Sequence, residues 1–480
     1  MARPYTEGVR LLPPQPQEAL YRRVYRSLRE AVLSGELRSG ARIPSSRVLA
    51  REWGVARNTV IEAVELLATE GYLVTREASG TFVAPRLSPE PAPQSATMPP
   101  LHLSAWAKRA LNEAQPVPQT FESAAFEIDF RVGQVPTELF PSEAWAQVLS
   151  ARAPELRRGG YGDELGPLET REALCAYLER ERGVSATPDM LMLTSGSQGS
   201  LDALARLLLE GGRSAAIEDP GYPAARRVFA ASGANVIPVP VDEQGLRPQD
   251  LPPQAALLYV TPAHQFPTGA VLPAGRRLAL LEWAARTGAW VIEDDYNSEF
   301  RFESRPLTAL QGLSPGSVIH VGTFSKSLAP ALRSGYLVAP PHLVRTLAHV
   351  RALTDRQPPT LDALALADFL EGGQYARHVR KARALAEERE GALLDALKAE
   401  LPEWSPKASG AGLHLLVELP PSLSEKVVQT LAAQAGVGLS ILSSYSMRPQ
   451  LPAVLLAFAH LPPPVIEEGI RRLRRALEGE

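Results

Sequence analysis

The stretch Thr323-Phe-Ser-Lys-Ser-Leu-Ala-Pro-Ala-Leu-Arg333 decides the fold expected for most of this 480-residue chain. It presents Lys326 on a short turn between hydroxyl side chains, and Arg333 follows seven residues later. A lysine that forms a Schiff base needs this setting: hydroxyl groups nearby, limited solvent and a second cation for a cofactor phosphate. Because a Ser-Lys pair is common in proteins, the interpretation depends on companion motifs elsewhere in the chain.

Two of these motifs lie upstream, each after a predicted strand. Thr194-Ser-Gly-Ser-Gln198 opens a helix, where backbone N–H groups and the hydroxyl of Ser197 form an anion site. Glu218-Asp-Pro-Gly-Tyr-Pro223 places Tyr222 on a turn. An aromatic ring there either stacks on a flat heterocycle or is an ordinary turn residue.

Two more motifs follow in the same order. The loop Thr261–Gly269 contains His264, which either reaches a ring oxygen or hydrogen bonds the loop backbone. Val291-Ile-Glu-Asp-Asp-Tyr296 ends a buried strand in three acids, and a buried carboxylate is costly unless it meets a cation or a donor. A protonated pyridine nitrogen is such a partner. Five motifs at the carboxyl ends of strands indicate one shared ligand site, because open α/β sheets bind ligands there.

Apolar strands alternate with longer helical patterns from about Phe126 onward. This alternation predicts an α/β domain with a mostly parallel sheet covered by helices on both faces. From roughly Pro341 the pattern predicts a smaller α+β lobe. The expected strands are 190–193, 214–217, 256–260, 290–293 and 317–321 in the sheet, with 413–419 and 454–458 in the lobe.

Composition limits the class of protein. The net charge is −3, and the single cysteine, Cys175, excludes an intramolecular disulfide framework and indicates a reducing compartment. The chain has no 18-residue apolar run and no signal-peptide core, so we expect a cytoplasmic protein without a membrane span. The eight histidines lack ligand spacing, so no metal site is expected.

The N-terminal part differs from the rest. Residues 17–83 predict a compact helical domain that ends in two short strands, and Leu20, Val24, Leu28 and Val32 share one face of its first helix. Between residues 20 and 83 there are ten Arg and seven Glu, with no Lys or Asp. Residues 84–120 contain eight prolines and predict an extended linker, with a short helix possible near 101–111.

Two helices separated by a turn at Gly54 have the helix-turn-helix pattern within this domain. The second helix is expected over 57–69 and starts with polar side chains, as in helices whose first residues meet base edges in the major groove. Arginine suits guanine, and Asn or Thr reaches bases or phosphates. The alternative is a small helical cap on an enzyme.

The segment GELRSGARIPSSRVLAREWGVARNTVIEAVELLATEGYLVTREASGTFVA, residues 35–84, resembles the winged helix-turn-helix of GntR-family regulators. The resemblance implies double-stranded operator DNA as a partner. It also implies DNA contacts from Arg47, Arg57, Asn58, Thr59 and Gly80. Members often have Ser or Thr where this chain has Ala56, so one helix N-cap is expected to be absent, worth about 1 kcal/mol.

The five motifs together resemble fold type I enzymes dependent on pyridoxal 5'-phosphate, over roughly 126–480. This implies Lys326 as the Schiff-base lysine and Asp294 on the pyridine nitrogen, with Asp295 as the second candidate. It also implies Tyr296 near the phenolic oxygen and Tyr222 over the ring. The same resemblance assigns the phosphate to Ser197, Gln198, Thr323, Ser325 and Arg333.

The combination of both parts is similar to the MocR subfamily of regulators, whose members form head-to-tail dimers with each head over the partner's body. Active aminotransferases carry a carboxylate-binding arginine in a late strand, where this chain has Leu455. The resemblance therefore implies a regulator that senses pyridoxal phosphate, alone or with an amine-bearing effector, with vitamin B6 or amine metabolism as a target. The alternative is a working aminotransferase with an accessory DNA-binding head.

Overall fold

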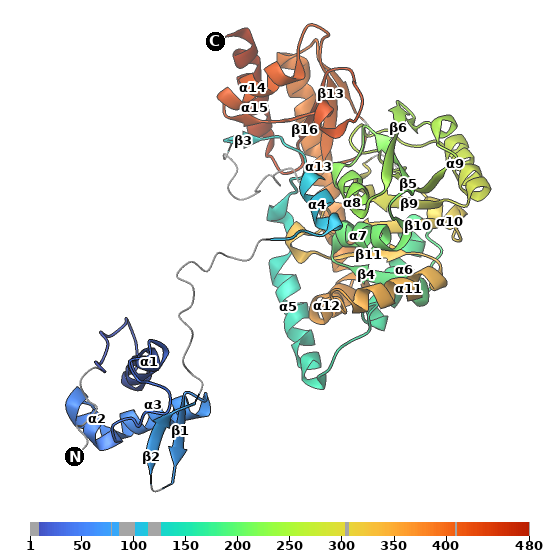
Figure 1. The fold of residues 1–480 in the computed structure, drawn as a ribbon. Coiled ribbons are helices and arrows are strands. Elements are labelled where there is room, and N and C mark those ends of the chain that lie inside the picture. The colour runs from blue at the N-terminus through green and yellow to red at the C-terminus, as the bar shows by residue number, and fades with distance from the viewer. Residues whose placement is uncertain are drawn as a thin grey trace. The chain divides into compact units, whose positions relative to one another are not determined.

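The computed structural model describes residues 9–77, 79–85, 101–113, 126–302, 307–408 and 410–479. The chain divides into two compact units, one up to His102 and one from Leu103 onward. Figure 1 shows both units, each with its own helices and strands. Much of the predicted linker, at 86–100 and 114–120, lies outside the described residues.

The first unit is a three-helix domain with a two-stranded wing. It consists of α1 (Leu20–Leu33), α2 (Ser46–Trp53), α3 (Arg57–Thr69), β1 (Leu73–Arg76) and β2 (Gly80–Val83), and the two strands pair antiparallel. Val24, Leu28 and Leu67 are fully buried in its core. Leu20 lies on the same face of α1 but is its first residue and is 44% exposed, so burial of this face begins at Val24.

Local sequence explains how these helices begin and end. The hydroxyl of Ser45 caps α2 by accepting a hydrogen bond from the Val48 backbone N–H at 3.4 Å. Gly54 follows α2 with φ +64°, in the left-handed region that glycine adopts without strain. Ala56 precedes α3 and makes no side-chain cap, as predicted.

The second unit is built on an eight-stranded sheet, with the strand order β4-β11-β10-β9-β8-β5-β6-β7. The neighbours β10, β9, β8, β5 and β6 are parallel, whereas β11 runs antiparallel to β10 and β4, and β7 to β6. The predicted mostly parallel sheet is therefore confirmed. The strands are β4 (Leu191–Thr194), β5 (Ser214–Asp219), β6 (Asn235–Asp242), β7 (Gly245–Leu246), β8 (Ala255–Val260), β9 (Trp290–Asp295), β10 (Val318–Thr323) and β11 (Gly335–Val338).

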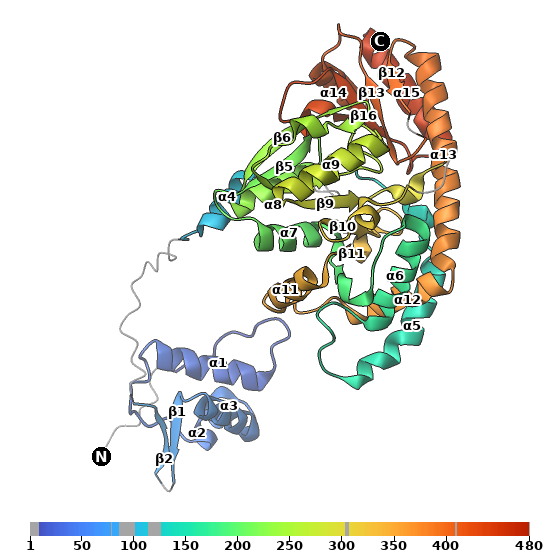
Figure 2. The same cartoon turned by 90° about the vertical axis from the view of Figure 1, so that its right-hand side faces the viewer.

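Helices cover both faces of this sheet (Figure 2). Successive strand residues face opposite sides, so Ala215 and Ile217 pack in one core cluster and Ala216 packs in another. Cys175 is buried among the helices, as expected for a core thiol, and burial raises its pKa to about 11. The covering helices are α5 (Ser142–Arg152), α6 (Leu168–Arg182), α7 (Gly196–Leu208), α8 (Pro223–Ser232), α9 (Ala274–Thr287), α10 (Leu310–Leu313), α11 (Pro341–Ala352) and α12 (Thr360–Glu371).

A smaller lobe packs a four-stranded antiparallel sheet, in the order β12-β13-β16-β15, against helices. Its core begins near Ala382 and also includes Ile128 and Phe130. The expected start near Pro341 is too early, because the apolar face of α11 packs on the large sheet instead. The elements are β12 (Ser405–Lys407), β13 (His414–Glu418), β15 (Ser440–Ile441), β16 (Ala453–Ala457), α13 (Gln374–Glu400), α14 (Glu425–Gln434) and α15 (Pro463–Glu478), with β14 (Val437–Gly438) pairing with β3 (Ile128–Asp129).

One helix, α4 (Ala105–Glu113), lies inside the range predicted as linker but packs on the second unit. Arg109 donates from Nε to the Ala231 carbonyl at 2.9 Å, and the guanidinium of Arg206 lies 5.2 Å from the Trp106 ring centre. These contacts attach α4 to α7 and α8. Among the described residues, no helix combines the length and the apolar character needed to cross a bilayer.

Candidate functional site

A cavity of about 340 Å³ lies at the carboxyl ends of β4, β5, β8, β9 and β10, where the five sequence motifs meet. Its volume is within the range of small-molecule sites. Nine of the ten predicted cofactor residues line it: Ser197, Gln198, Tyr222, Asp294, Tyr296, Thr323, Ser325, Lys326 and Arg333.

Lys326 reaches into this cavity from the turn after β10. Its Nζ donates to the Gly133 carbonyl at 3.0 Å, and burial lowers the pKa of the Lys326 ammonium to about 8. The turn is held by the Thr323 hydroxyl, which donates to Ser325 Oγ at 3.1 Å and accepts from the Ser325 backbone N–H at 3.2 Å. A lowered pKa leaves more of the lysine as the uncharged nucleophile at neutral pH.

The two neighbouring aspartates at the end of β9 face different surroundings. Asp294 lines the cavity, accepts from the Tyr259 hydroxyl at 2.6 Å, and keeps its buried Oδ1 without a partner among the described residues. Asp295 instead accepts from Arg182 Nε at 2.8 Å in a buried ion pair. Burial, helped by the charge of Asp295, raises the pKa of Asp294 to about 7. A cation in the cavity would therefore meet Asp294.

An anion cradle forms where α7 begins. Ser197 and Gln198 are in the first turn of α7, where free N–H groups and the helix dipole favour negative charge. Arg333 donates from Nη2 to the Ser195 carbonyl at 2.9 Å and remains exposed. A Cβ on Gly335 would lie 2.7 Å from the Gly196 Cα, so only glycine allows this close approach.

Aromatic rings form another part of the lining. The ring of Tyr222 is stacked near Tyr259, with centres 6.5 Å apart and planes at 25°, and meets the edge of Phe266 at 5.7 Å. Tyr296 is partly buried, its hydroxyl oxygen is buried, and the polar side chain next to that hydroxyl is Asn297. A flat ligand in this cavity would meet aromatic faces and an available phenol.

His264 is the exception among the predicted cofactor residues. It does not line the cavity, and its ring packs 6.2 Å from Tyr296 and 6.1 Å from His414, measured between centres. Burial lowers the pKa of His264 to about 3, and neither ring nitrogen has a partner among the described residues. His264 makes no hydrogen bond to the loop backbone among the described residues, and Tyr296, unlike His264, lines the cavity.

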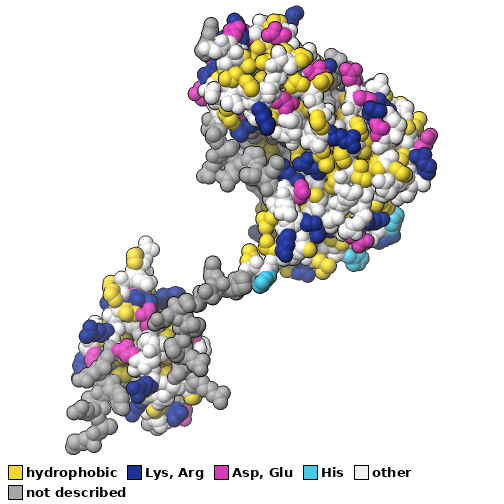
Figure 3. Space-filling view, turned by 45° about the horizontal axis from the view of Figure 1, so that its top comes forward, with side chains coloured by type: hydrophobic (Ala, Val, Ile, Leu, Met, Phe, Trp, Pro, Cys, Tyr) yellow, Lys and Arg dark blue, Asp and Glu magenta, His cyan; other side chains and the backbone are white. Residues whose placement is uncertain are grey.

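On the head, three of the five predicted DNA-contacting residues begin α3, whereas Arg47 lies in α2 and Gly80 begins β2. Arg47, Arg57 and Asn58 are exposed, and Thr59 is partly exposed. Arg57 Nε lies 3.4 Å from the Ser46 hydroxyl, which brings the first turns of α2 and α3 together. Figure 3 shows Arg side chains at several places on one face of the head.

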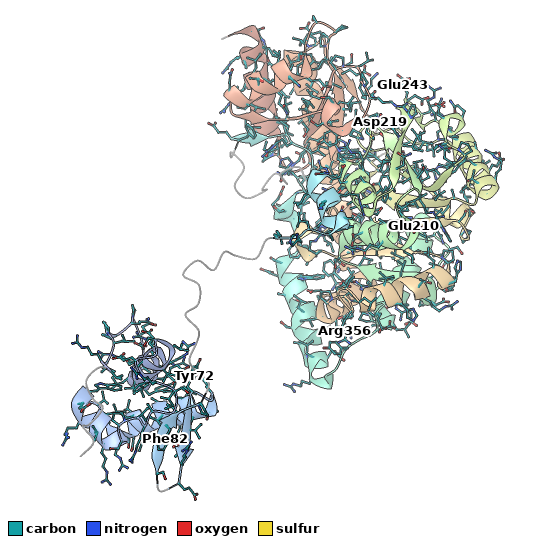
Figure 4. All side chains as sticks on the ribbon, in the orientation of Figure 1. Tyr72, Phe82, Glu210, Asp219, Glu243 and Arg356 are labelled. Atoms are coloured by element: carbon teal, nitrogen blue, oxygen red, sulfur yellow. The ribbon has the colours of Figure 1, made fainter. Side chains whose placement is uncertain are left out.

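Beside the wing lies an arginine, Arg42, that the sequence did not single out. A Cβ on Gly80 would lie 2.7 Å from Arg42 Nε, so the glycine leaves room for this guanidinium. Arg42 pairs across from Phe82, which is labelled in Figure 4, and the Arg76 guanidinium lies 5.0 Å from that ring. Arg42 precedes α2 in the chain and carries no motif there, and only the folded wing brings Gly80 beside it.

Comparisons with known proteins agree with this arrangement. The gntR family of bacterial regulatory proteins matches residues 20–83, and the class I and II aminotransferase family matches residues 127–473. The chain is 35% identical to the probable rhizopine catabolism regulatory protein MocR of Rhizobium meliloti over 95% of this chain and 93% of that one. The chain belongs to the MocR subfamily of GntR-family regulators.

Other relatives extend this assignment. The MocR-subfamily chain is 34% identical to the HTH-type pyridoxine biosynthesis transcriptional regulator PdxR of Corynebacterium glutamicum, over 87% of each chain. Its fold resembles that of LysN, an alpha-aminoadipate aminotransferase from Thermus thermophilus complexed with N-(5'-phosphopyridoxyl)-L-leucine. The TM-score is 0.71 at 26% identity, over 78% of this chain and 97% of that one. The predicted fold, a winged head followed by a fold type I body, is confirmed.

Several cavity residues of this MocR-subfamily chain were not predicted from sequence. Tyr259 is the donor to Asp294, and Gly133 supplies the acceptor for Lys326. Others come from the smaller lobe or from the end of β9 and carry no motif: Asn297, Leu413, His414, Tyr445 and Ala457. The apolar pattern of β8 could have identified a buried Tyr259, but nothing local indicates that the lobe closes the cavity.

Proposed function

We propose that this chain is a cytoplasmic transcription regulator that binds pyridoxal phosphate in the cavity and double-stranded operator DNA through the winged head. One observation carries the proposal. A partly buried lysine, a buried aspartate with an unpartnered oxygen and an anion cradle converge on one cavity, in a chain whose other unit exposes Arg57 at the start of α3.

The cavity residues fit the cofactor. Asp294 Oδ1 is a buried acceptor without a partner among the described residues, and a protonated pyridine nitrogen supplies the missing donor and cation. Lys326 offers an amine with a lowered pKa. When bound, pyridoxal phosphate supplies an aldehyde that reacts with amines and a ring that accepts electrons.

The remaining cavity residues orient the pyridoxal phosphate. Tyr296 donates from its hydroxyl to the phenolic oxygen, and Tyr222 stacks on the ring. The phosphate is held by the first turn of α7, the turn before Lys326 and the guanidinium that follows it. These residues are Ser197, Gln198, Thr323, Ser325 and Arg333.

In the head, Arg57, Asn58 and Thr59 meet bases and phosphates in the major groove. Arg47 and the wing at Gly80, with Arg42 beside it, contact phosphates. Phosphate contacts position the head, whereas the first turn of α3 reads sequence.

We infer that two chains pair head-to-tail, with each head over the partner's body, and that cofactor with or without an amine-bearing effector biases the placement of the two heads. Such coupling between sites is reciprocal, so operator DNA must change the affinity for the ligand by the same factor. Genes of vitamin B6 or amine metabolism are the proposed targets.

The test uses the full-length protein and fluorescent DNA from upstream of its own gene. We expect the protein to develop visible absorbance with pyridoxal phosphate, and its DNA affinity to change when the cofactor is added. Lys326→Ala should lose the absorbance and the response while retaining basal DNA binding. Wild-type protein that stays colourless with excess pyridoxal phosphate would refute the proposal.

An active aminotransferase is the second candidate, favoured by the complete set of cavity residues. Leu455 argues against it: it is fully buried on the same face of β16 as Ala457, against Val132 and Tyr445. Leucine cannot form the bidentate contact that arginine makes with a carboxylate. We expect no rapid multiple turnover with amino acids and a keto acid, and such turnover would favour the enzyme.

A further inference from the structure

One wall of the cavity consists of Leu413, His414, Tyr445 and Ala457 from the smaller lobe, together with Phe266 from the loop after β8. We call these five residues the small-lobe wall. The ring centre of Phe266 lies 5.4 Å from Tyr445 and 5.6 Å from His414. His414 and Ala457 are paired across β13 and β16. This wall lies on the lobe side of the cavity, whereas the anion cradle belongs to the large sheet.

The small-lobe wall is uncharged at neutral pH. Burial lowers the pKa of His414 to about 4, and its Nε2 donates to the Pro267 carbonyl at 3.1 Å. The other members are aliphatic or aromatic, and Leu455 backs the wall through its contact with Tyr445. The cations that line the cavity, Lys326 and Arg333, bind the aldehyde and the phosphate of the cofactor in the proposed function. A carboxylate placed against this wall would therefore lose hydration without gaining a cation from the wall itself.

Beside this wall stands a neutral polar side chain that the cofactor does not use. Asn297 lines the cavity and is only 2% exposed. Neither polar atom of its amide makes a well-aligned hydrogen bond among the described residues, and the Tyr296 hydroxyl is its polar neighbour. A Cβ on Gly412 would lie 3.2 Å from Asn297 Nδ2, so this amide is beside the segment that carries Leu413. Buried amides are nearly always hydrogen bonded, so this one is available to a ligand.

We propose that Asn297 and the small-lobe wall select an effector amine whose substituent is uncharged and carries a hydroxyl or amide group, in preference to the amino acid with the same carbon skeleton. The Asn297 amide can both donate to and accept from such a group. The apolar wall contacts the hydrocarbon part. This inference rests on the proposed function, because it concerns an effector bound beside pyridoxal phosphate.

Three probes with one carbon skeleton test the selection: leucinol, leucine and 4-methylpentan-2-amine. The skeleton suits a cavity of this fold, since the related LysN structure holds a phosphopyridoxyl-leucine. Full-length protein is first loaded with pyridoxal phosphate, and each probe is titrated by visible absorbance and by the shift in unfolding temperature. We expect leucinol to bind about 3- to 10-fold more tightly than 4-methylpentan-2-amine, as one neutral hydrogen bond provides, and leucine to bind most weakly.

Asn297→Ala should remove the advantage of leucinol over 4-methylpentan-2-amine and leave loading with pyridoxal phosphate intact. Asn235→Ala, which removes an exposed amide at the start of β6, is the matched control and should keep the advantage. Leucine binding as tightly as leucinol, no binding of any probe, or an unchanged preference in Asn297→Ala would overturn the inference. Failure of wild-type protein to load pyridoxal phosphate would instead refute the proposed function.

Discussion

The head and the cavity use their side chains in opposite ways. In the head, Arg47, Arg57 and Asn58 are exposed and come from one short stretch of chain. In the cavity, the lining residues come from positions between Val132 and Ala457, and Asp294 is 3% exposed. An exposed arginine contributes only the contacts that it makes with its ligand, whereas a buried polar group also satisfies the hydrogen bonds of its protein neighbours.

This difference predicts how substitutions behave. Removing an exposed head residue costs the contacts that residue makes with DNA. Removing a buried cavity residue also leaves its partners without hydrogen bonds, as for Tyr259 beside Asp294. Substitutions in the cavity should therefore weaken pyridoxal phosphate binding more than substitutions in the head weaken DNA binding.

The largest effect is expected for Asp294→Ala. The affinity for pyridoxal phosphate should fall by about 2–5 kcal/mol, because the substitution removes one partner of a buried charge pair. Titration by visible absorbance measures this loss. Asp395→Ala removes an exposed carboxylate from α13 and should leave the affinity unchanged. Equal affinities of the two variants for pyridoxal phosphate would show that Asp294 does not bind the cofactor.

The pH dependence of cofactor capture should be the next largest effect. Lys326 reacts as the uncharged amine, and its pKa is lowered to about 8, so capture should speed up as pH rises towards 8. From pH 6 to pH 8 the uncharged fraction rises about 50-fold. Stopped-flow absorbance of cofactor-free protein measures the rate. A rate that keeps rising at the same slope to pH 10 would indicate an ordinary lysine pKa.

Arg57→Ala should have a smaller effect, on the other unit. Specific DNA binding should weaken by about 1–3 kcal/mol, with the cofactor spectrum unchanged. Fluorescence anisotropy with operator and scrambled DNA separates specific from general binding. Arg22→Ala removes an exposed arginine from α1 and serves as the control. If Arg57→Ala and Arg22→Ala weaken binding to operator and scrambled DNA equally, the arginines contribute only charge and α3 does not read bases.

The smallest effect is expected for Ala56→Ser. Ala56 already has the extended backbone of an N-cap, φ −67° and ψ 143°, so a hydroxyl acceptor should stabilise α3 by about 1 kcal/mol. Amide hydrogen exchange at Asn58 and Thr59 should slow about 5-fold. Ala56→Val, which adds bulk without a hydrogen-bond acceptor, should not slow amide exchange at these two residues.

Sequence predicted the local elements well and the boundaries between larger parts less well. The helix over 57–69 has the predicted bounds because its polar start and apolar face are local signals. The start of the smaller lobe was misplaced because α11 is amphipathic, and amphipathicity does not say which sheet the apolar face meets. His264 was misplaced because a loop motif does not tell which side chain faces the cavity.

By itself, the sequence determined the two-part organisation, the winged head, the parallel sheet and the set of motifs at its strand ends. These follow from periodicity, capping and turn residues, which act over a few positions. Only the tertiary structure decided that Asp294 and not Asp295 faces the cavity, since Arg182 pairs with Asp295. It also brought Asn297 and His414 together beside the cavity, because packing between a sheet and a distant lobe depends on the shapes of both.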